Sequence, residues 1–267
     1  MERILLWKSG TPGYQAAYGQ PEPYLQPYWV EDAAVHPVMI LCPGGGYTHI
    51  GTKEGEPVAR WLNSIGIHVL QLQYRYKPYT GPIIVEDIRR AIRLARFWLE
   101  EKGRPAPVGV MGFSAGGHLA ACAALYFDAP HKQRDAADAY SSRPDAAVLC
   151  YSVLSSGPKA DVDEVYRSFL GEEPEGQNES WYVPDQHVRP DMPPVFLWHT
   201  AEDPVVPVYN SLQMAQALQE KGVPVELHLY PHGPHALALA TDRSDGAEDW
   251  TEACARWLQR VWKQSAL

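Results

Sequence analysis

One pentapeptide, Gly112-Phe-Ser-Ala-Gly116, stands between two apolar segments and limits the folds open to this chain. The run 108–111 before it is short and apolar, which predicts a buried strand. The segment 115–125 after it consists mainly of small apolar residues, which predicts a helix. Ser114 would then lie on a tight strand-to-helix turn, where small neighbours push its hydroxyl outward. The glycine spacing alone is common by chance, but this context favours a nucleophilic serine.

A serine attacks effectively only when a base takes its proton and an acid orients that base. In hydrolases of the α/β type, the acid and the histidine follow the serine along the chain, each just past a later strand. Here Asp203 lies in the loop after the apolar run 194–198, and His235 lies in the loop after the predicted strand 225–230. Order and position therefore predict a triad of Ser114, His235 and Asp203.

Neighbouring residues compete for two of these roles. Glu202 could serve in place of Asp203, although the proline that follows Asp203 favours the aspartate. His232 competes with His235, and spacing alone barely separates them. His228, His232 and His235 might together suggest a metal site, but the prolines and glycine among them preclude a single helical face. We therefore expect no metal.

Three consecutive glycines, Gly44 to Gly46, follow the apolar run 38–42. Such a stretch costs backbone entropy, and the reason here would be amides left bare for a developing negative oxygen. We expect the amides of Gly45 and Gly46 to donate from one side and that of Ala115 from the other. A phosphate-binding loop is the alternative, but neither a Gly-Lys-Ser/Thr nor a Gly-x-Gly-x-x-Gly pattern is present.

Five segments together resemble the small α/β-hydrolase esterases grouped with acetyl-xylan esterases and bacterial feruloyl-esterase-like proteins. The segments are Cys42-Pro-Gly-Gly-Gly-Tyr47, Glu54-Gly-Glu-Pro-Val-Ala59, Gly112-Phe-Ser-Ala-Gly-Gly-His-Leu-Ala120, Phe196-Leu-Trp-His-Thr-Ala-Glu-Asp203 and Tyr230-Pro-His-Gly-Pro-His235. In that family the histidine after Gly-Pro is the base, which favours His235 over His232. The family often has glycine after this histidine, whereas this chain has Ala236, whose methyl group could narrow the pocket near the base.

The resemblance implies a serine carboxylic-ester hydrolase that removes short acyl groups, acetyl first among them, from sugar-like or other small esters, without a cofactor. Two other classes compete with this interpretation. A peptidase of the prolyl-oligopeptidase type shares the fold and the triad order, but it usually carries a large extra domain for which this chain has no room. A non-catalytic small-molecule-binding protein on an esterase scaffold usually lacks a triad member, and all three candidates stand here.

Strand-like and helix-like segments alternate, which predicts one α/β-hydrolase domain over 1–267 with a mostly parallel central sheet flanked by helices. The predicted strands are 4–7, 38–42, 68–74, 108–111, 146–152, 194–198 and 225–230. The predicted helices are 56–64, 84–102, 115–125, 207–221 and 247–264. The segment 9–35 is rich in Pro, Tyr and Gln, and we expect it to be a loop.

The segment 155–192 is less regular and lies where this fold inserts a cap, so we expect a small lid there. Tyr47, together with Trp181 and Tyr182 of this segment, are candidates for the walls of an acyl or sugar pocket. Ordinary packing of aromatic side chains is an equal alternative. His118, on the predicted helix after the serine, is expected to be structural.

The formal net charge of −9 argues against nucleic acid and anionic membranes as partners and suits a small neutral ester, with an acetylated oligosaccharide as one candidate. The cysteines are widely spaced, and we expect buried free thiols. They are Cys42, Cys122, Cys150 and Cys254. The N-terminus shows no signal-peptide pattern and no stretch approaches ~20 apolar residues, so a cytoplasmic location is expected. Exposed edge strands would allow a homo-oligomer.

Overall fold

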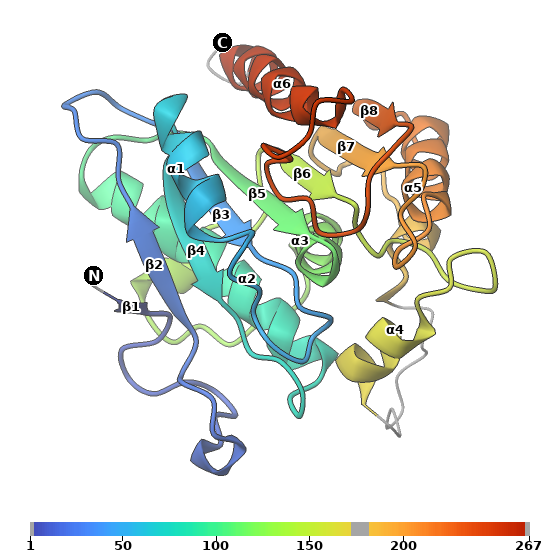
Figure 1. The fold of residues 1–267 in the computed structure, drawn as a ribbon. Coiled ribbons are helices and arrows are strands. Elements are labelled where there is room, and N and C mark those ends of the chain that lie inside the picture. Colours follow the sequence, from blue (N-terminus) through green and yellow to red (C-terminus); the bar gives the residue numbers. More distant parts are fainter. Residues whose placement is uncertain (1–2, 172–181, 265–267) are drawn as a thin grey trace.

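The computed structural model describes residues 3–171 and 182–264, and a sheet of eight strands runs through its centre (Figure 1). The strands are β1 (Ile4–Leu5), β2 (Tyr24–Tyr28), β3 (Val38–Cys42), β4 (His68–Gln73), β5 (Val108–Phe113), β6 (Ala147–Cys150), β7 (Val195–Thr200) and β8 (Val225–Tyr230). Their order in the sheet is β1-β2-β4-β3-β5-β6-β7-β8. Neighbours from β4 to β8 are parallel, and β2 runs antiparallel to β1 and β4. This is the predicted α/β-hydrolase arrangement.

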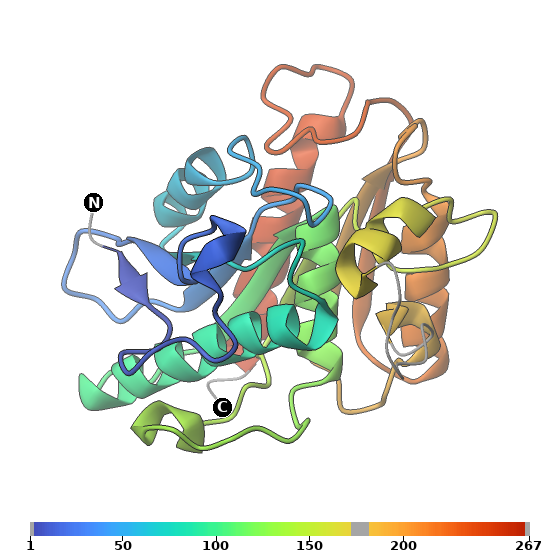
Figure 2. The same ribbon diagram turned by 90° about the horizontal axis from the view of Figure 1, so that it is seen from below.

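Helices cover both faces of the sheet, as its buried parallel strands require. They are α1 (Glu56–Ser64), α2 (Gly81–Glu101), α3 (Ala115–Leu125), α4 (Asp163–Leu170), α5 (Tyr209–Glu220) and α6 (Trp250–Gln264). Leu62 of α1 and Trp257 of α6 belong to the hydrophobic cluster on one face. Side chains of α2, α3 and α5 fill the cluster on the other face. Figure 2 shows α1 and α2 on opposite sides of the sheet.

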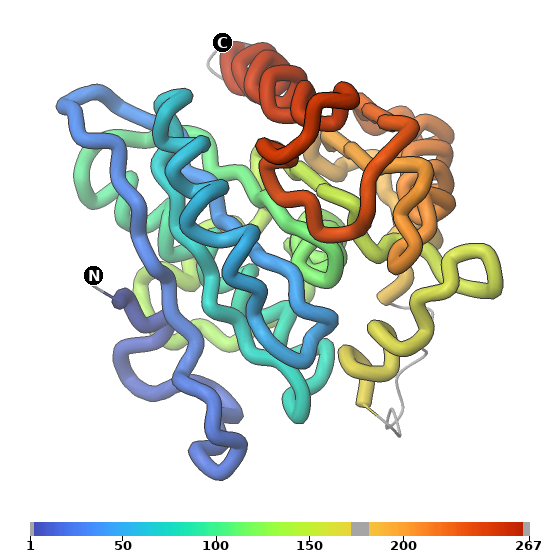
Figure 3. The backbone as a smooth tube through the Cα atoms, in the orientation of Figure 1, coloured from blue at the N-terminus to red at the C-terminus, as the bar shows by residue number. Residues whose placement is uncertain are grey.

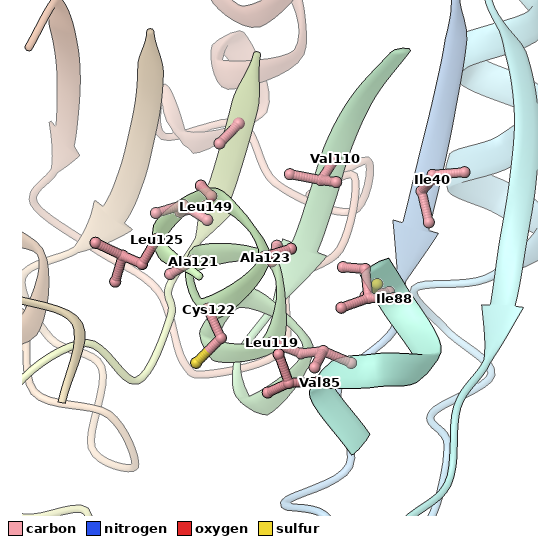
Figure 4. Close-up of a cluster of buried hydrophobic side chains, with 14 of the residues drawn as sticks. Ile40, Val85, Ile88, Val110, Leu119, Ala121, Cys122, Ala123, Leu125 and Leu149 are labelled. Carbon is pink, nitrogen blue, oxygen red and sulfur yellow. The ribbon is translucent and has the colours of Figure 1, made fainter. Parts of the chain in front are cut away.

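The core next to Ser114 is built around α3, all of whose residues are buried. Figure 4 shows Leu119 of this helix beside Val85 and Ile88 of α2, with Val110 of β5 nearby. Small side chains allow α3 to approach the sheet closely. At Gly117 an added Cβ would lie only 1.8 Å from the Ser152 hydroxyl oxygen. The helix that follows the serine is therefore fixed rigidly against the strands.

The prediction that 9–35 is a loop is wrong in one part, because β2 lies within it. The five residues of β2 include Gln26 and Pro27 and show no clean alternation. The strand exists because its backbone pairs along its whole length with β4, where Tyr24 faces Gln73 and Tyr28 faces Val69. This pairing joins residues more than 40 positions apart, which local patterns do not report.

Other boundaries shift by a few residues. Helix α2 begins at Gly81, one turn earlier than the predicted start at Ile84, because Pro82 suits the first turn of a helix. Within 155–192 the structure contains α4 and a single turn of helix at 184–186, while Trp181 lies outside the described residues. Whether this segment acts as a lid stays a prediction.

Two expectations drawn from composition can be compared with the structure. All four cysteines are free and buried, as predicted. In the ranges 3–171 and 182–264, no helix is both long enough and apolar enough to span a bilayer.

Candidate active site

Loops from five strands meet at one edge of the sheet, because the parallel strands end nearly in register. Cys42 at the end of β3 pairs with Gly112 of β5, and Phe113 pairs with Cys150 at the end of β6. The segment after β8, red in Figure 3, folds back across this edge toward the start of α3. Residues far apart in the sequence are thereby brought to one place.

Ser114 occupies the turn between β5 and α3 in a backbone conformation that side chains rarely adopt, with φ 52° and ψ −120°. Two glycines make this turn sterically feasible. A Cβ at Gly112 would lie 2.1 Å from the carbonyl oxygen of Gly116, and one at Gly116 would lie 2.2 Å from that of Cys42. The Gly-x-Ser-x-Gly spacing thus has a direct physical cause here.

A continuous hydrogen-bonded chain runs from Ser114 to Asp203. The Ser114 Oγ lies 2.9 Å from His235 Nε2, and His235 Nδ1 lies 2.7 Å from Asp203 Oδ2. A carboxylate only accepts, so His235 carries its proton on Nδ1, and Nε2 is free to accept from the serine hydroxyl. The structure therefore brings together the three residues of the predicted triad in the order needed for proton removal.

Asp203 is held as an anion beneath the histidine. Burial acts to raise its pKa, but hydrogen bonds from His199 and His235 outweigh burial and hold the pKa well below its usual range. The amides of Val205 and Val206 donate to Asp203 Oδ1 at 2.9 Å and 3.0 Å. The carboxylate is fixed in position and keeps its charge at neutral pH.

The competing residues form a second, exposed pair. His232 Nδ1 lies 2.9 Å from Glu202 Oε1, and these side chains are 58% and 60% exposed. In the first pair, the side chains of His235 and Asp203 are 13% and 1% exposed. Of these two histidines, His235 is the one that lies within hydrogen-bonding distance of the Ser114 hydroxyl, so the geometry favours His235 and Asp203 over their neighbours. His228 forms a separate pair with Glu226, in which His228 Nε2 lies 2.9 Å from Glu226 Oε1.

The glycine loop after β3 lies against the serine. An added Cβ at Gly44 would lie 3.2 Å from Ser114 Cβ. The amide of Gly44 is already engaged, because it donates to Glu54 at 2.6 Å. Among backbone hydrogen bonds of the described chain outside regular helices and strands, none uses the amides of Gly45 or Gly46 as donors.

Ala115 begins α3, so its amide has no partner within the helix and lies at the positive end of the helix dipole. Together with Gly45 and Gly46, it makes up the set of donors predicted for an oxyanion hole.

The predicted pocket walls have different surroundings. Tyr47 is fully buried, and its hydroxyl contacts His118 Nδ1 at 2.7 Å, so it supports the glycine loop from within and offers no surface to a ligand. Of the two alternatives given for Tyr47, these contacts favour packing of an aromatic side chain over a pocket wall. Tyr182 packs on Phe169 at 5.1 Å between ring centroids and lines a cleft of about 580 Å³ together with Tyr126. A role for Tyr182 in substrate binding stays a prediction.

His118 links the segments on which these tyrosines lie. Its Nε2 donates to the carbonyl oxygen of Tyr182 at 2.7 Å, so Nδ1 accepts from the Tyr47 hydroxyl. The ring is fully enclosed, and burial lowers the pKa of His118 to about 4. The structural role expected for His118 agrees with these contacts.

Sequence reasoning missed several residues around the site. His199 approaches Asp203 Oδ2 at 3.3 Å and donates to the Val206 carbonyl oxygen at 2.8 Å. Glu54 contacts the glycine loop through the amide of Gly44, and Tyr151 contacts the His235 loop through the amide of Ala238. His199 lies in the same short segment as Asp203, which was the available signal, whereas Tyr151 is 97 residues away from its partner Glu54.

The model of the BD-FAE family matches residues 27–218, which is most of the chain. This protein belongs to the BD-FAE family. The matched region contains the glycine loop, Ser114 and Asp203, whereas His235 lies beyond it.

The chain is also similar to proteins of known name. The chain is 33% identical to the protein named endo-1,4-beta-xylanase B of Butyrivibrio fibrisolvens over 89% of its own length. It is 30% identical to an acetylxylan esterase of Xylanibacter ruminicola over 76%. It spans only 38% and 41% of the lengths of these two relatives.

Among solved structures, an acetyl ester-xyloside bifunctional hydrolase from Caldicellulosiruptor lactoaceticus is 41% identical. It superposes with a TM-score of 0.89 over 97% of this chain and 96% of that one. The α/β-hydrolase fold of this BD-FAE protein is thereby confirmed.

Proposed function

We propose that this protein is a serine carboxylesterase that hydrolyses short-acyl esters, with Ser114 as nucleophile, His235 as base and Asp203 as the residue that orients the base. The observation that supports this most is the hydrogen-bonded chain of 2.9 Å and 2.7 Å that ends on a serine in a strained turn. Membership of a family whose relatives are named esterases points to the same reaction.

The proposed reaction has two steps. In the first, His235 Nε2 takes the hydroxyl proton of Ser114 as its oxygen attacks the ester carbonyl carbon, and the resulting imidazolium is stabilised by Asp203. The tetrahedral intermediate collapses, the alcohol leaves with the proton from His235, and the acyl group stays on the serine oxygen. In the second, water loses a proton to His235 and attacks the acyl-enzyme, which releases the carboxylic acid and restores Ser114.

The negative oxygen of each tetrahedral intermediate would be held by the amides of Gly45, Gly46 and Ala115. The loop geometry supports this assignment, because the amide of Gly44 already donates to Glu54, whereas those of Gly45 and Gly46 donate to no backbone acceptor in the described turns and loops. Losing one such donor typically reduces turnover by about 10²–10³. The loop therefore has to be held rigidly against Ser114.

The proposed substrates are acetyl esters of small sugar-like alcohols, with acetylated xylo-oligosaccharides first. This proposal rests on two similar proteins, an acetylxylan esterase and an acetyl ester-xyloside bifunctional hydrolase. The net charge of −9 suits a neutral ester better than an anionic one.

Acetate release from acetylated xylo-oligosaccharides tests the proposal, run beside p-nitrophenyl acetate with the Ser114→Ala protein as blank. We expect release from both substrates by the natural sequence and none above background by the variant. Turnover of the nitrophenyl ester alone would keep the proposed triad and contradict the sugar alcohol. Turnover that survives in Ser114→Ala would contradict the nucleophile.

A further inference from the structure

The carboxyl group of Glu54 is buried at the base of the glycine loop, with 4% of the residue exposed. Its two oxygens bind different partners. Oε2 accepts from the amide of Gly44 at 2.6 Å, and Oε1 accepts from the hydroxyl of Tyr151 at 2.7 Å. One side chain therefore contacts both the glycine loop and the residue that follows β6.

Tyr151 extends this connection to the His235 loop, the segment 231–240 that follows β8. Its hydroxyl oxygen accepts from the amide of Ala238 at 3.0 Å while its proton goes to Glu54. Its ring meets the His235 imidazole edge to face, with centroids 5.1 Å apart and planes at 71°. Tyr151 is 2% exposed and itself adopts a positive φ of 37°.

The His235 loop needs such a contact, because its own backbone is strained. Ala236, Ala238 and Ala240 have φ values of 60°, 53° and 54°. These values lie in the left-handed region, which residues other than glycine disfavour. Strained residues persist only where surrounding structure holds them. For Ala238 that support comes from the Tyr151 hydroxyl and from Trp250, whose indole N–H donates to the Ala238 carbonyl oxygen at 3.1 Å.

We propose that Glu54 and Tyr151 are positioning residues that fasten the glycine loop and the His235 loop to one buried carboxyl group. In this way the group that holds the oxyanion and the group that removes the proton keep a fixed separation on either side of Ser114. The inference rests on the proposed esterase function and adds residues that act through Gly44 and Ala238 without touching the substrate.

The chemistry of the network explains why a carboxyl group is needed. Both partners of Glu54 donate hydrogen bonds, and an ionised carboxylate accepts on both oxygens. Glutamine has nearly the same shape but only one acceptor oxygen, so in Glu54→Gln one of the two donors must face an NH₂ group. Tyr151→Phe keeps the ring against His235 and removes both the donor to Glu54 and the acceptor for Ala238.

The test compares these two variants with Tyr79→Phe as a matched control. Tyr79 is 3% exposed, and its hydroxyl also accepts one amide, from Gln15 at 2.9 Å, and donates one bond, to the Gln15 carbonyl oxygen at 3.3 Å. Loss of this hydroxyl removes one accepted and one donated bond from a buried tyrosine outside the proposed network, although its donated bond goes to a neutral carbonyl oxygen and not to a carboxyl group. Both phenylalanine variants should lower the melting temperature, Tyr151→Phe by more, because it also leaves the buried Glu54 Oε1 without its donor.

With p-nitrophenyl acetate, and with rates expressed per Ser114 labelled by an organophosphonate, we expect kcat of Glu54→Gln and of Tyr151→Phe to fall about 10- to 100-fold while KM stays within about threefold. Tyr79→Phe should stay within about twofold of the natural sequence in both constants. A merely structural role would lower stability and leave kcat per labelled serine unchanged, which would overturn the inference.

The double variant Glu54→Gln/Tyr151→Phe decides whether the two residues act as one unit. We expect its kcat to be no lower than that of the worse single variant, because both substitutions break the same connection. Losses that multiply would overturn the inference, and if Tyr151→Phe fails to fold, the kcat and KM of the isosteric Glu54→Gln decide alone. Turnover that survives Ser114→Ala would refute the proposed function itself, whereas Ser114-dependent turnover with unaffected network variants refutes only this inference.

Discussion

Two histidine–carboxylate pairs share the loops after β7 and β8, and their surroundings give them different chemical properties. The exposed pair of His232 and Glu202 is surrounded by water, where such interactions contribute little. The pair of His235 and Asp203 is largely buried, and the low pKa of Asp203 keeps a negative charge under the imidazole. At the scale of single residues, burial and access to Ser114 distinguish base from bystander.

Substitutions in the two pairs should therefore have unequal effects. We expect His235→Ala and Asp203→Asn to lower kcat by about 10⁴-fold or more, because each removes or misorients the base. The matched variants His232→Ala and Glu202→Gln should retain activity within about twofold. Steady-state kinetics on p-nitrophenyl acetate measure all four, and loss of activity in His232→Ala with retention in His235→Ala would reverse the assignment.

How far the sequence predicts the site depends on the distance between its parts along the chain. Ser114, Asp203 and His235 could be proposed because each follows an apolar run at a strand end. Glu54 and Tyr151 could not be proposed from the sequence, because their positioning role depends on a contact across 97 positions and on two bonds from backbone amides. The two alternatives for Tyr47 could not be separated for the same reason, since its partner His118 is 71 positions away.

At the scale of elements, the glycine loop combines two glycines with different constraints. Gly45 has a φ of 134°, and an added Cβ would lie 2.1 Å from the carbonyl oxygen of His49. Gly46 has a φ of 58°, and an added Cβ would meet nothing within 4 Å. The loop therefore requires glycine at position 45 for its shape, while position 46 requires only tolerance of a left-handed backbone.

Alanine at these two positions should distinguish the steric requirement at position 45 from the backbone requirement at position 46. We expect Gly45→Ala to lower kcat/KM by about 100-fold or more, because the loop must move and its amides then no longer point toward the oxyanion. Gly46→Ala keeps the backbone amide, and its methyl group meets no neighbouring atom. The left-handed backbone should therefore cost about 1–2 kcal/mol of stability, with a much smaller loss of activity. Kinetics and urea unfolding of both variants check this, and equal losses of activity would contradict the described loop.

Elements with a strong local pattern were predictable, and those formed by distant pairing were not. The apolar runs of β3, β5 and β7 and the helical spacing of α2 and α6 identify themselves in the sequence. Strand β2 depends on backbone bonds to β4 and includes Pro27, so no local signal marks it. Helix α4 is only eight residues long, and it lies in a segment whose composition suggests irregular structure.

At the scale of the whole molecule, His118 connects the helix after the nucleophile to two other segments, through Tyr47 and through the carbonyl group of Tyr182. Burial lowers the pKa of His118 from 6.5 to about 4, so the folded protein keeps this ring neutral where the unfolded chain would protonate it. The resulting contribution to stability is fully present above about pH 6.5 and is lost as the pH falls through 4.

This predicts a specific pH dependence of the free energy of unfolding. Between pH 6.5 and 4 the unfolded state gains about one proton relative to the folded state at His118, which amounts to about 3 kcal/mol. Urea unfolding at intervals of one pH unit should show a steeper decline for the natural sequence than for His118→Gln. Parallel curves would contradict it. Asp203, whose pKa is lowered, contributes in a different window, since its stabilisation is lost only as the pH falls below about 3.8.

The proposed reaction passes through an acyl-enzyme on Ser114, which can be observed directly. Acid quenching during turnover of p-nitrophenyl acetate, followed by peptide mass spectrometry, locates any acetyl group on the chain. We predict one acetyl group on the peptide that contains Ser114, its absence in Ser114→Ala, and slow release of the group in Asp203→Asn. Continued acetate release with no acetyl group on Ser114, or with the group on another side chain, would contradict the proposed role of Ser114 as nucleophile.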